Sequence, residues 1–370
     1  MHVNTRNVNT AFCSLVEGVH TGSIDTIRTT SRNGDVLQIP EPMIITYQQP
    51  RERVLFNKAR DANPFFHLFE TVWMLSGSND VNSVAFFAPN MFNYSDDGET
   101  LNGAYGYRWR GGMFDQLSLL IEHLQNKPDS RRAVLQMWNV SDDLLALEAS
   151  KDVCCNLSVC FSISDASTGL VWGPNAPADK VPGTPIAEKY LDMTVFNRSN
   201  DLVWGCLGAN VVHFSMLQEY MACALGMRVG VYNQISNNLH VYVNNWQPEK
   251  WLEEEQHSGC YPVLPNTPLF SDRGVFDTEC VDLVTVFSPN TNGFPNLKQV
   301  HIALEKLPIY EPFLAGVVRP MCLAFISHKE RRYDQANYYL AQVTAPDWKK
   351  AGTEWVERRS SNWQAKQALV

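Results

Sequence analysis

The chain has 370 residues, of which 45% are hydrophobic and 19% charged, a mix that predicts a globular protein with a sizeable core. Its formal net charge of −9 and its pI near 5.5 argue against a broad basic face that binds a nucleic-acid polymer. A local arginine cluster can still hold one phosphate, so a small phosphorylated ligand fits better.

The nine cysteines show no disulfide framework, because no CxxC motif occurs and Cys154 and Cys155 are adjacent. We therefore expect reduced thiols in a cytoplasmic protein. Residues 1–6 lack the apolar core of a signal peptide, and no run approaches the roughly 20 apolar residues of a membrane span. Neither secretion nor membrane insertion is predicted.

The first strong element is a helix over residues 64–77. Asn63 can cap it, its phenylalanines form a broad apolar face, and Gly77 supplies a stop. Glu70 lies inside that apolar face. A carboxylate in this position is expected to be paired or used in chemistry, because its desolvation is costly.

A second helix is expected over about 114–126, and strands over 132–138, 156–163 and 190–197. Residues 164–188, between the last two strands, are rich in Gly, Pro, Ala and Asp. This composition predicts a long, partly irregular excursion from a strand pair.

The second half of the chain alternates helical and strand-like segments. The expected elements, in order, are a helix over 211–225, a strand over 240–243, a helix over 247–256, a strand over 281–287, and helices over 312–327 and 334–343. No repeat or clear linker divides the chain. We therefore predict one α+β domain over 1–370, with its core at about 28–246 and a C-terminal extension over 247–370.

Cys155 is the candidate nucleophile. It starts a strand-like segment, and a thiol at the edge of a strand can face a cleft where a nearby arginine favours the thiolate. The alternative is a buried core cysteine, the common state of this residue type.

Three arginines are candidates for binding a phosphate. Arg131 and Arg132 adjoin in the predicted helix-to-strand turn, which suits forked contacts with phosphate oxygens, and Arg32 occupies another loop that can close over the same anion. The alternative is a solvated surface patch.

His240 and Tyr242 alternate on one predicted strand, so both point to the same face and can jointly contact a sugar hydroxyl. A pair that only lines a half-buried strand is the alternative. No His, Cys, Asp and Glu group has metal-ligand spacing, and neither GxGxxG nor GxxxxGK occurs. We therefore predict no metal and no nucleoside-triphosphate chemistry.

Taken in order, these motifs resemble the thymidylate synthase family, which includes the phage-type pyrimidine nucleotide hydroxymethylases. The resemblance covers about residues 31–242. Its landmarks are Glu70 with Trp73 and Gly77, Asn102-Gly103-Ala104-Tyr105-Gly106-Tyr107-Arg108-Trp109-Arg110, Asp129-Ser130-Arg131-Arg132, Trp138-Asn139, Cys155, Arg198-Ser199-Asn200-Asp201 with Gly205, and His240-Val241-Tyr242.

The resemblance implies a twisted mixed sheet packed with helices, with one sheet face forming the interface of an obligate homodimer. Each active site would borrow Arg131 and Arg132 from the other subunit. Cys155 would attack C6 of a pyrimidine monophosphate and make C5 a nucleophile toward the methylene carbon of 5,10-methylenetetrahydrofolate, the co-substrate.

The family also implies roles for the remaining site residues. Arg32, Arg198 and Ser199 would hold the phosphate, together with the partner's arginine pair. His240 and Tyr242 would hold the ribose, and Glu70 would organise water for proton transfers. Tyr105 is a further candidate catalytic residue, Asp201 would meet the pterin, and Trp109 and Met91 are candidate folate contacts.

Two departures from the family pattern bear on the product. The family's usual Pro-Cys-His context is replaced by Cys154-Cys155-Asn156, and Met91 stands about where an aromatic side chain usually screens the methylene intermediate from water. The intermediate can take hydride and become a methyl group, or take water and become a hydroxymethyl group. We therefore predict a hydroxymethylase of the kind found in phages, with thymidylate synthase as the alternative.

The base depends on one position. The family reads uracil with an asparagine after the Arg-Ser-x-Asp motif, whereas the ungapped position here is Ala209 and Asn210 follows it. A one-residue insertion would restore Asn210 as the reader, but an amide can flip to serve dUMP or dCMP. Uracil is favoured, because no carboxylate is available there.

Two other classes of protein remain as alternatives. A catalytically inactive regulator that binds nucleotide or RNA would be expected to lack the nucleophile or the phosphate clamp, and both are present. A hydrolase using Cys155 and His240 would explain neither the arginines nor Asp201.

Overall fold

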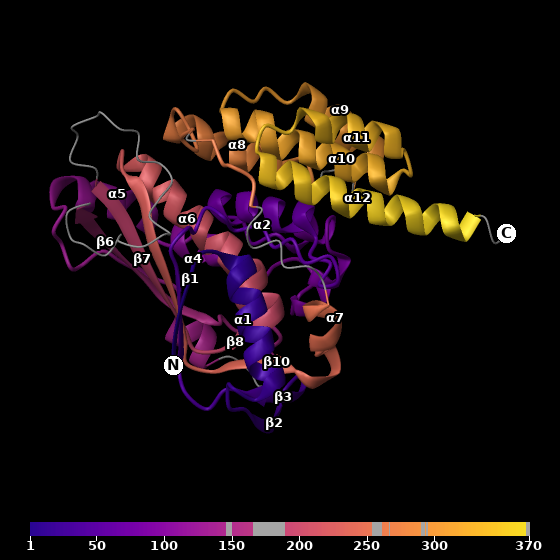
Figure 1. The fold of residues 1–370 in the computed structure, drawn as a ribbon. Helices are drawn as coiled ribbons and strands as arrows, with labels where there is room; N and C mark the ends of the chain where they lie inside the picture. Colours follow the sequence, from indigo (N-terminus) through magenta and orange to yellow (C-terminus); the bar gives the residue numbers. More distant parts are fainter. Residues whose placement is uncertain are drawn as a thin grey trace. The chain divides into compact units, whose positions relative to one another are not determined.

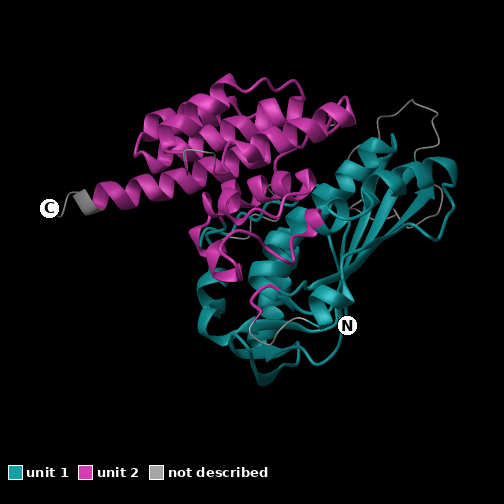
Figure 2. Ribbon diagram, turned by 180° about the vertical axis from the view of Figure 1, so that it is seen from behind, with its two compact units in different colours: residues 1–62, 108–146, 153–261 teal, residues 63–107, 147–152, 262–370 magenta. Residues whose placement is uncertain are grey.

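The computed structural model describes residues 1–145, 150–165, 189–253, 261–265, 267–289, 293 and 295–367. The chain divides into two compact units, which we describe separately. Unit 1 comprises residues 1–62, 108–146 and 153–261, and unit 2 comprises residues 63–107, 147–152 and 262–370 (Figure 2). Most of the expected excursion over 164–188 lies outside the described residues.

Unit 1 is built on two β-sheets. A six-stranded mixed sheet has the order β1-β4-β9-β7-β6-β5, and a four-stranded sheet has the order β2-β3-β10-β8. The strands are β1 (His2–Thr5), β2 (Ile27–Ser31), β3 (Gly34–Gln38), β4 (Met43–Tyr47), β5 (Val134–Gln136), β6 (Asn156–Asp165), β7 (Lys189–Asn197), β8 (Asn200–Asp201), β9 (Arg228–Ser236) and β10 (Leu239–Tyr242). The predicted α+β class and mixed sheet are confirmed.

Three helices pack on the six-stranded sheet. They are α1 (Val8–Thr21), α5 (Gln116–Asn126) and α6 (Asn210–Ala224). The short α7 (Pro248–Leu252) packs on α1, and α4 (Tyr105–Arg110) spans the sequence boundary between unit 2 and unit 1. α6 packs on β7 and β9 (Figure 1). Gln218 of α6 fixes this packing, because its Nε2 donates to the carbonyl oxygens of Leu191 (2.8 Å) and Val231 (3.0 Å).

Unit 2 is helical. Its elements are α2 (Pro64–Ser76), α3 (Val81–Ala85), the 3-10 helix η1 (Pro89–Tyr94), α8 (Arg273–Thr285), α9 (Leu297–Lys306), the π-helix η7 (Leu314–Val318), α10 (Arg319–Lys329), α11 (Tyr333–Gln342) and α12 (Pro346–Gln367). The expected caps of α2 are confirmed: the Asn63 side chain accepts from Phe65 N and Phe66 N, and Gly77 ends the helix with a φ of 79°.

An aromatic core joins α2 to the C-terminal extension. Phe65 lies 5.5 Å from Phe325 of α10 and 5.3 Å from Trp355 of α12, measured between ring centroids. Phe69 packs edge-on against Phe287 at 4.7 Å. The apolar face of the phenylalanine-rich helix is therefore buried by residues that lie far along the sequence.

The strand expected over residues 281–287 is wrong, because this stretch belongs to α8 and the turn that follows it. The β-branched valines of residues 281–287 suggested a strand. Burial instead recurs at Phe276, Cys280, Leu283 and Val284, the spacing of one helix face, and Asp272 caps the helix by accepting from Val275 N.

Among the described residues, no helix is both long and apolar enough to cross a membrane. Eight of the nine cysteines lie in the described part of the chain, and all eight are free thiols.

Replacing Phe325 by alanine is expected to destabilise unit 2 by about 3–5 kcal/mol, because it removes a buried ring from the aromatic core. Urea unfolding measures the change. Tyr338→Ala, at a 64% exposed aromatic of α11, is the control and is expected to shift stability by less than about 1 kcal/mol. Equal effects of the two changes would contradict the packing described.

Candidate active site

Two adjacent cysteines precede β6, and the structure distinguishes them. Cys154 is 1% exposed, its thiol donates to the Asn156 carbonyl oxygen at 3.1 Å, and burial raises its pKa to about 12. Cys155 is half-buried. Cys155 is therefore the more exposed of the two thiols, and its role as the nucleophile stays a prediction.

Arg198 holds the segment that carries this thiol. Its Nε donates to the Cys154 carbonyl oxygen at 2.8 Å, and its Nη2 donates to the Val153 carbonyl oxygen at 3.0 Å. The same Nη2 lies 3.9 Å from the Cys155 sulfur. The guanidinium thus fixes the two successive carbonyl groups that precede Cys155, and it places positive charge where a thiolate would form.

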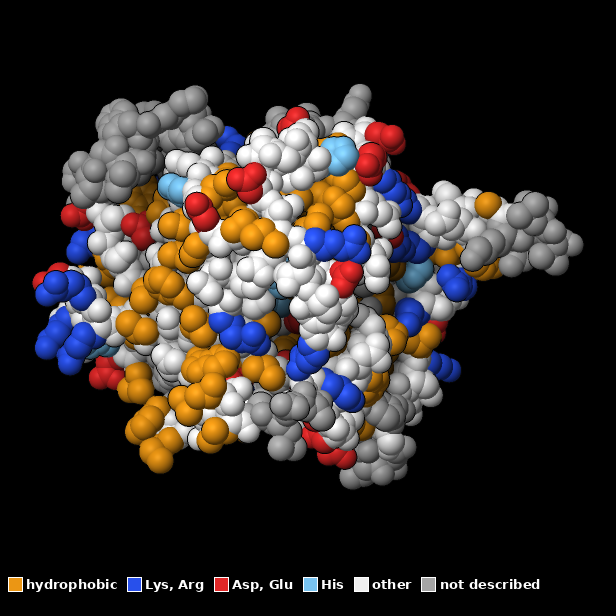
Figure 3. Space-filling model, turned by 90° about the horizontal axis from the view of Figure 1, so that it is seen from below, with side chains coloured by type: hydrophobic (Ala, Val, Ile, Leu, Met, Phe, Trp, Pro, Cys, Tyr) orange, Lys and Arg blue, Asp and Glu red, His pale blue; other side chains and the backbone are white. Residues whose placement is uncertain are grey.

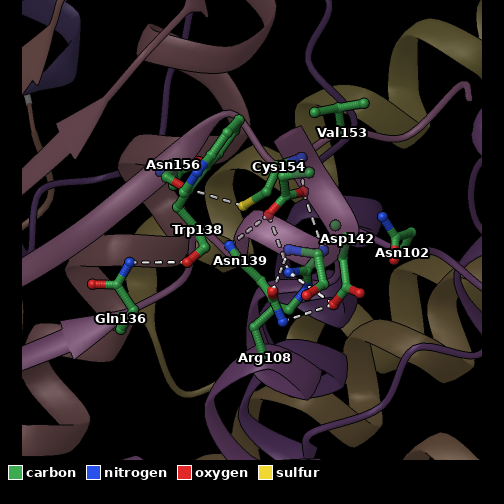
Figure 4. A network of polar contacts seen from close by, with 12 residues as sticks. Asn102, Arg108, Gln136, Trp138, Asn139, Asp142, Val153, Cys154 and Asn156 are labelled. Atoms are coloured by element: carbon green, nitrogen blue, oxygen red, sulfur yellow. Dashed lines mark hydrogen bonds and ion pairs between the residues drawn. The ribbon is translucent and has the colours of Figure 1, made fainter. Parts of the chain in front are cut away.

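A buried ion pair also contacts this segment (Figure 4). Arg108 donates to both carboxylate oxygens of Asp143, at 3.1 and 3.2 Å, and the two side chains are 7% and 0% exposed. Asp143 also accepts from the backbone N–H of Cys154 at 3.0 Å and from that of Asn139 at 2.8 Å. Both carboxylate oxygens of Asp143 therefore accept hydrogen bonds, which compensate for the desolvation of its buried charge.

Asn156, where the family has histidine, is fully buried. Its Nδ2 donates to Asn197 Oδ1 at 2.6 Å, and the Asn197 amide donates to the Ile235 carbonyl oxygen at 3.0 Å. This pair of amides links β6, β7 and β9 directly behind the nucleophile.

The four-stranded sheet carries residues that are predicted to bind the sugar and the phosphate. His240 pairs with Asp201 across β10 and β8, and the His240 and Tyr242 rings lie edge-on at 5.3 Å on one face of β10, as predicted. Asn33 Nδ2 lies 3.5 Å from the Tyr242 hydroxyl, so the hairpin turn that carries Arg32 reaches the same end of the sheet.

The electrostatics of this sheet keep His240 neutral. Burial lowers the pKa of His240 and outweighs the opposing effect of Asp201, and burial raises the pKa of Asp201. Asp201 also caps the following helix by accepting from Val203 N and Trp204 N. Arg60, which the sequence did not suggest, lies over the Trp204 ring at 3.6 Å, and burial lowers its pKa to about 10.

A π-helix, η4 (Leu202–Ala209), lies between Asp201 and α6, in the segment where the sequence predicts a one-residue insertion before Asn210. A π-turn accommodates an extra residue, and Gly208 interrupts the helix with φ −118° and ψ −106°. Asn210 then begins α6, is 6% exposed, and donates through Nδ2 to Asn200 Oδ1 at 3.1 Å.

The other candidates are placed as follows. Ser199 is half-buried between β7 and β8, Arg131 and Arg132 are exposed on the turn before β5, and Trp109 is fully buried against Phe214 of α6. In unit 2, Glu70 on α2, Met91 on η1 and Tyr105 at the start of α4 are each half-buried. Their roles stay predictions.

Sequence reasoning missed the positioning groups Arg108, Asp143 and Asn200, whose importance depends on contacts between distant segments. Arg108 and Asn200 each stand within a landmark quoted above, and this was the only signal for either residue. In the described ranges, no group of three or more His, Cys, Asp or Glu side chains is arranged to hold a metal ion.

Comparison with known proteins gives a consistent set of similarities. The family model described as thymidylate synthase matches residues 58–283. A deoxyuridylate hydroxymethyltransferase of Pseudomonas phage M6 is 39% identical over 99% of this chain and 96% of its own length. Proteins of the same name from Bacillus phage SP01 (34% identical, over 60% of this chain and 57% of the relative) and Delftia phage PhiW-14 (31%, over 70% and 68%) are also similar.

Alkylation should distinguish the two adjacent thiols. Between about pH 6 and 9, iodoacetamide is expected to modify Cys155 and to leave Cys154 intact, because the Cys154 thiol is buried and stays protonated. Peptide mass spectrometry of the wild type and of Cys155→Ser locates the label. Modification of Cys154 in the folded protein would contradict the arrangement.

The Arg108–Asp143 pair gives a second prediction. Asp143→Asn is expected to cost about 3–5 kcal/mol and to slow alkylation of Cys155, because it leaves the Arg108 charge buried without a carboxylate. The neighbouring Asp142, 45% exposed and 3.5 Å from Arg108, is the control, and Asp142→Asn should cost less than about 1 kcal/mol. Urea unfolding and alkylation rates measure both, and indistinguishable variants would refute the role.

Proposed function

The chain belongs to the thymidylate synthase family, and from this we propose that it transfers a one-carbon unit from 5,10-methylenetetrahydrofolate to C5 of deoxyuridylate and releases the hydroxymethyl product. The observation that carries the proposal is the match to the Pseudomonas phage M6 deoxyuridylate hydroxymethyltransferase, which spans 99% of this chain and 96% of that protein. The geometry around Cys155 supports the same chemistry.

The reaction begins at Cys155. Its thiolate adds to C6 of the uracil ring, and the electron pair released to C5 forms the bond to the methylene carbon. Loss of the C5 proton and departure of tetrahydrofolate leave an exocyclic methylene group. Water adds to that carbon, and Cys155 leaves from C6 to restore the ring. The net reaction consumes deoxyuridylate, methylenetetrahydrofolate and water, and it yields 5-hydroxymethyldeoxyuridylate and tetrahydrofolate.

The residues of unit 1 support substrate binding. Arg198 uses Nε and Nη2 on backbone carbonyls, while its Nη1 makes no hydrogen bond within the described residues and is available for a phosphate oxygen. Arg32 and Ser199 complete this clamp. His240, kept neutral by burial, and Tyr242 hold the ribose hydroxyl, and Asn210 reads the base.

The remaining proposed roles belong to three residues of unit 2 and two of unit 1. Glu70 organises water for proton transfer, Tyr105 assists it, and Met91 leaves the methylene carbon open to water. Asp201 and Trp109 of unit 1 serve the folate, Asp201 by contact with the pterin. Transfer of water rather than hydride distinguishes this function from thymidylate synthase, the second candidate.

We also propose that the active enzyme is a homodimer. One face of the six-stranded sheet carries half-buried side chains, including Phe196, Val231 and Ile235, while the alternate residues of β7 and β9 are buried under helices. Exposed hydrophobic and basic side chains stand close together on one face of the molecule (Figure 3). Arg131 and Arg132 project from an exposed turn, which suits donation to the partner's phosphate site.

Product analysis tests the function. Purified protein with deoxyuridylate and methylenetetrahydrofolate should form 5-hydroxymethyldeoxyuridylate and tetrahydrofolate, and Cys155→Ser should lose on the order of 10³-fold or more in kcat/KM. Chromatography and mass spectrometry identify both products. Stoichiometric dihydrofolate and thymidylate would favour the synthase instead. Nucleotide binding with no turnover would favour a regulator.

Subunit mixing tests the shared site. Cys155→Ser and Arg131→Glu should each be inactive alone, and after exchange of subunits a mixture should recover about a quarter of the wild-type activity, because half of the dimers are mixed and each has one intact site. No recovery, with mixed dimers shown by native mass spectrometry, would contradict donation across the interface.

A further inference from the structure

We infer that Asn200 is a positioning residue that fixes the amide of Asn210 in the orientation that reads uracil and rejects cytosine. The inference rests on the proposed function, in which Asn210 faces the base. Asn200 occupies the variable position of the Arg-Ser-x-Asp motif, where no role was predicted from the sequence.

Asn200 is itself held firmly. It is 4% exposed on β8, and its backbone N–H donates to the Asn238 carbonyl oxygen at 2.9 Å. Its Oδ1 accepts from Asn210 Nδ2 at 3.1 Å, and its Nδ2 faces the Ser236 hydroxyl oxygen at 3.4 Å. Gly205 makes room for this arrangement, because a Cβ there would lie 2.6 Å from Asn200 Oδ1.

Ser236 gives the chain of hydrogen bonds a direction. Ser236 is 1% exposed on β9, and its hydroxyl oxygen accepts from Asn200 Nδ2 at 3.4 Å. Asn200 Oδ1 is therefore the end that faces Asn210.

The orientation of Asn210 follows from this order. Rotating its amide by 180° would place its carbonyl oxygen against Asn200 Oδ1, which would remove a buried hydrogen bond and bring two acceptor oxygens into contact. In the observed orientation, Asn210 Nδ2 donates to Asn200 Oδ1, and its carbonyl oxygen points away from that acceptor.

The two bases require opposite amides. Uracil presents N3–H as a donor and O4 as an acceptor, which match Asn Oδ1 and Nδ2 respectively. Cytosine presents N3 as an acceptor and its 4-amino group as a donor, which match the flipped amide. An amide held in one orientation accepts uracil and leaves cytosine with two mismatched polar contacts, whereas a freely rotating amide accommodates both.

The test compares kcat/KM for dUMP and dCMP in the full-length protein. Asn200→Val removes both side-chain hydrogen bonds on a strand and is expected to lower the dUMP-to-dCMP ratio about 10- to 100-fold, chiefly through a higher KM for dUMP and gained turnover of dCMP. Asn200→Asp keeps an acceptor for Asn210 Nδ2 and should retain the wild-type ratio.

Two further variants separate positioning from stability. Asn9→Ala removes another buried amide of unit 1, which donates to the Val54 carbonyl oxygen and accepts from Phe56 N, and it should leave the ratio unchanged. Ser236→Ala frees the Asn200 amide to rotate and should lower the ratio even if Asn200→Val does not fold.

An unchanged ratio in folded Asn200→Val, or in Ser236→Ala where the valine variant does not fold, would overturn the inference and leave the proposed function standing. A wild-type preference for dCMP would overturn it as well. Absence of one-carbon transfer to either nucleotide by the wild type would instead remove the proposed function.

Discussion

The hydrogen bonds from Arg198 to the carbonyl oxygens of Val153 and Cys154 are the interaction on which the proposed chemistry depends. They fix the backbone immediately before Cys155 and bring a permanent positive charge to 3.9 Å from its sulfur. A thiol on an irregular segment would otherwise sample several positions. Here the arginine supplies both the geometry and the electrostatic environment of a nucleophile.

This clamp is supported by buried polar groups rather than by apolar packing alone. Asp143 neutralises Arg108 and accepts from the Cys154 amide, while the Asn156–Asn197 pair joins three strands behind the thiol. Such groups contribute little net stability when paired but are costly when one partner is removed. We interpret them as fixing one arrangement of the site, at the expense of a more stable apolar core.

The sequence predicted those elements whose signals are local. α2 was found from its cap, its phenylalanine face and Gly77, and β6 and β7 from their alternation. The strand predicted over 281–287 was wrong. Its β-branched residues suggested a strand, but the segment packs on α2 as part of a helix. β9 and α12 were not predicted, since their burial depends on partners distant in the sequence.

The candidate site also contains residues that the sequence indicated and contacts that it could not indicate. Residue types and family order indicated Cys155, Arg198, His240 and Tyr242, and the structure brings the first two together and pairs the last two on β10. The contact between Asn210 and Asn200 could not be predicted, because it requires the π-helix that absorbs an extra residue.

The central claim is that Cys155, held by Arg198, forms a covalent bond to C6 of a uracil nucleotide. The most direct measurement is mass spectrometry of the protein incubated with 5-fluorodeoxyuridylate and methylenetetrahydrofolate, followed by peptide mapping. A stable adduct of nucleotide and folate on Cys155, absent from Cys155→Ser, is the predicted result. No adduct, or an adduct on another cysteine, would contradict the account.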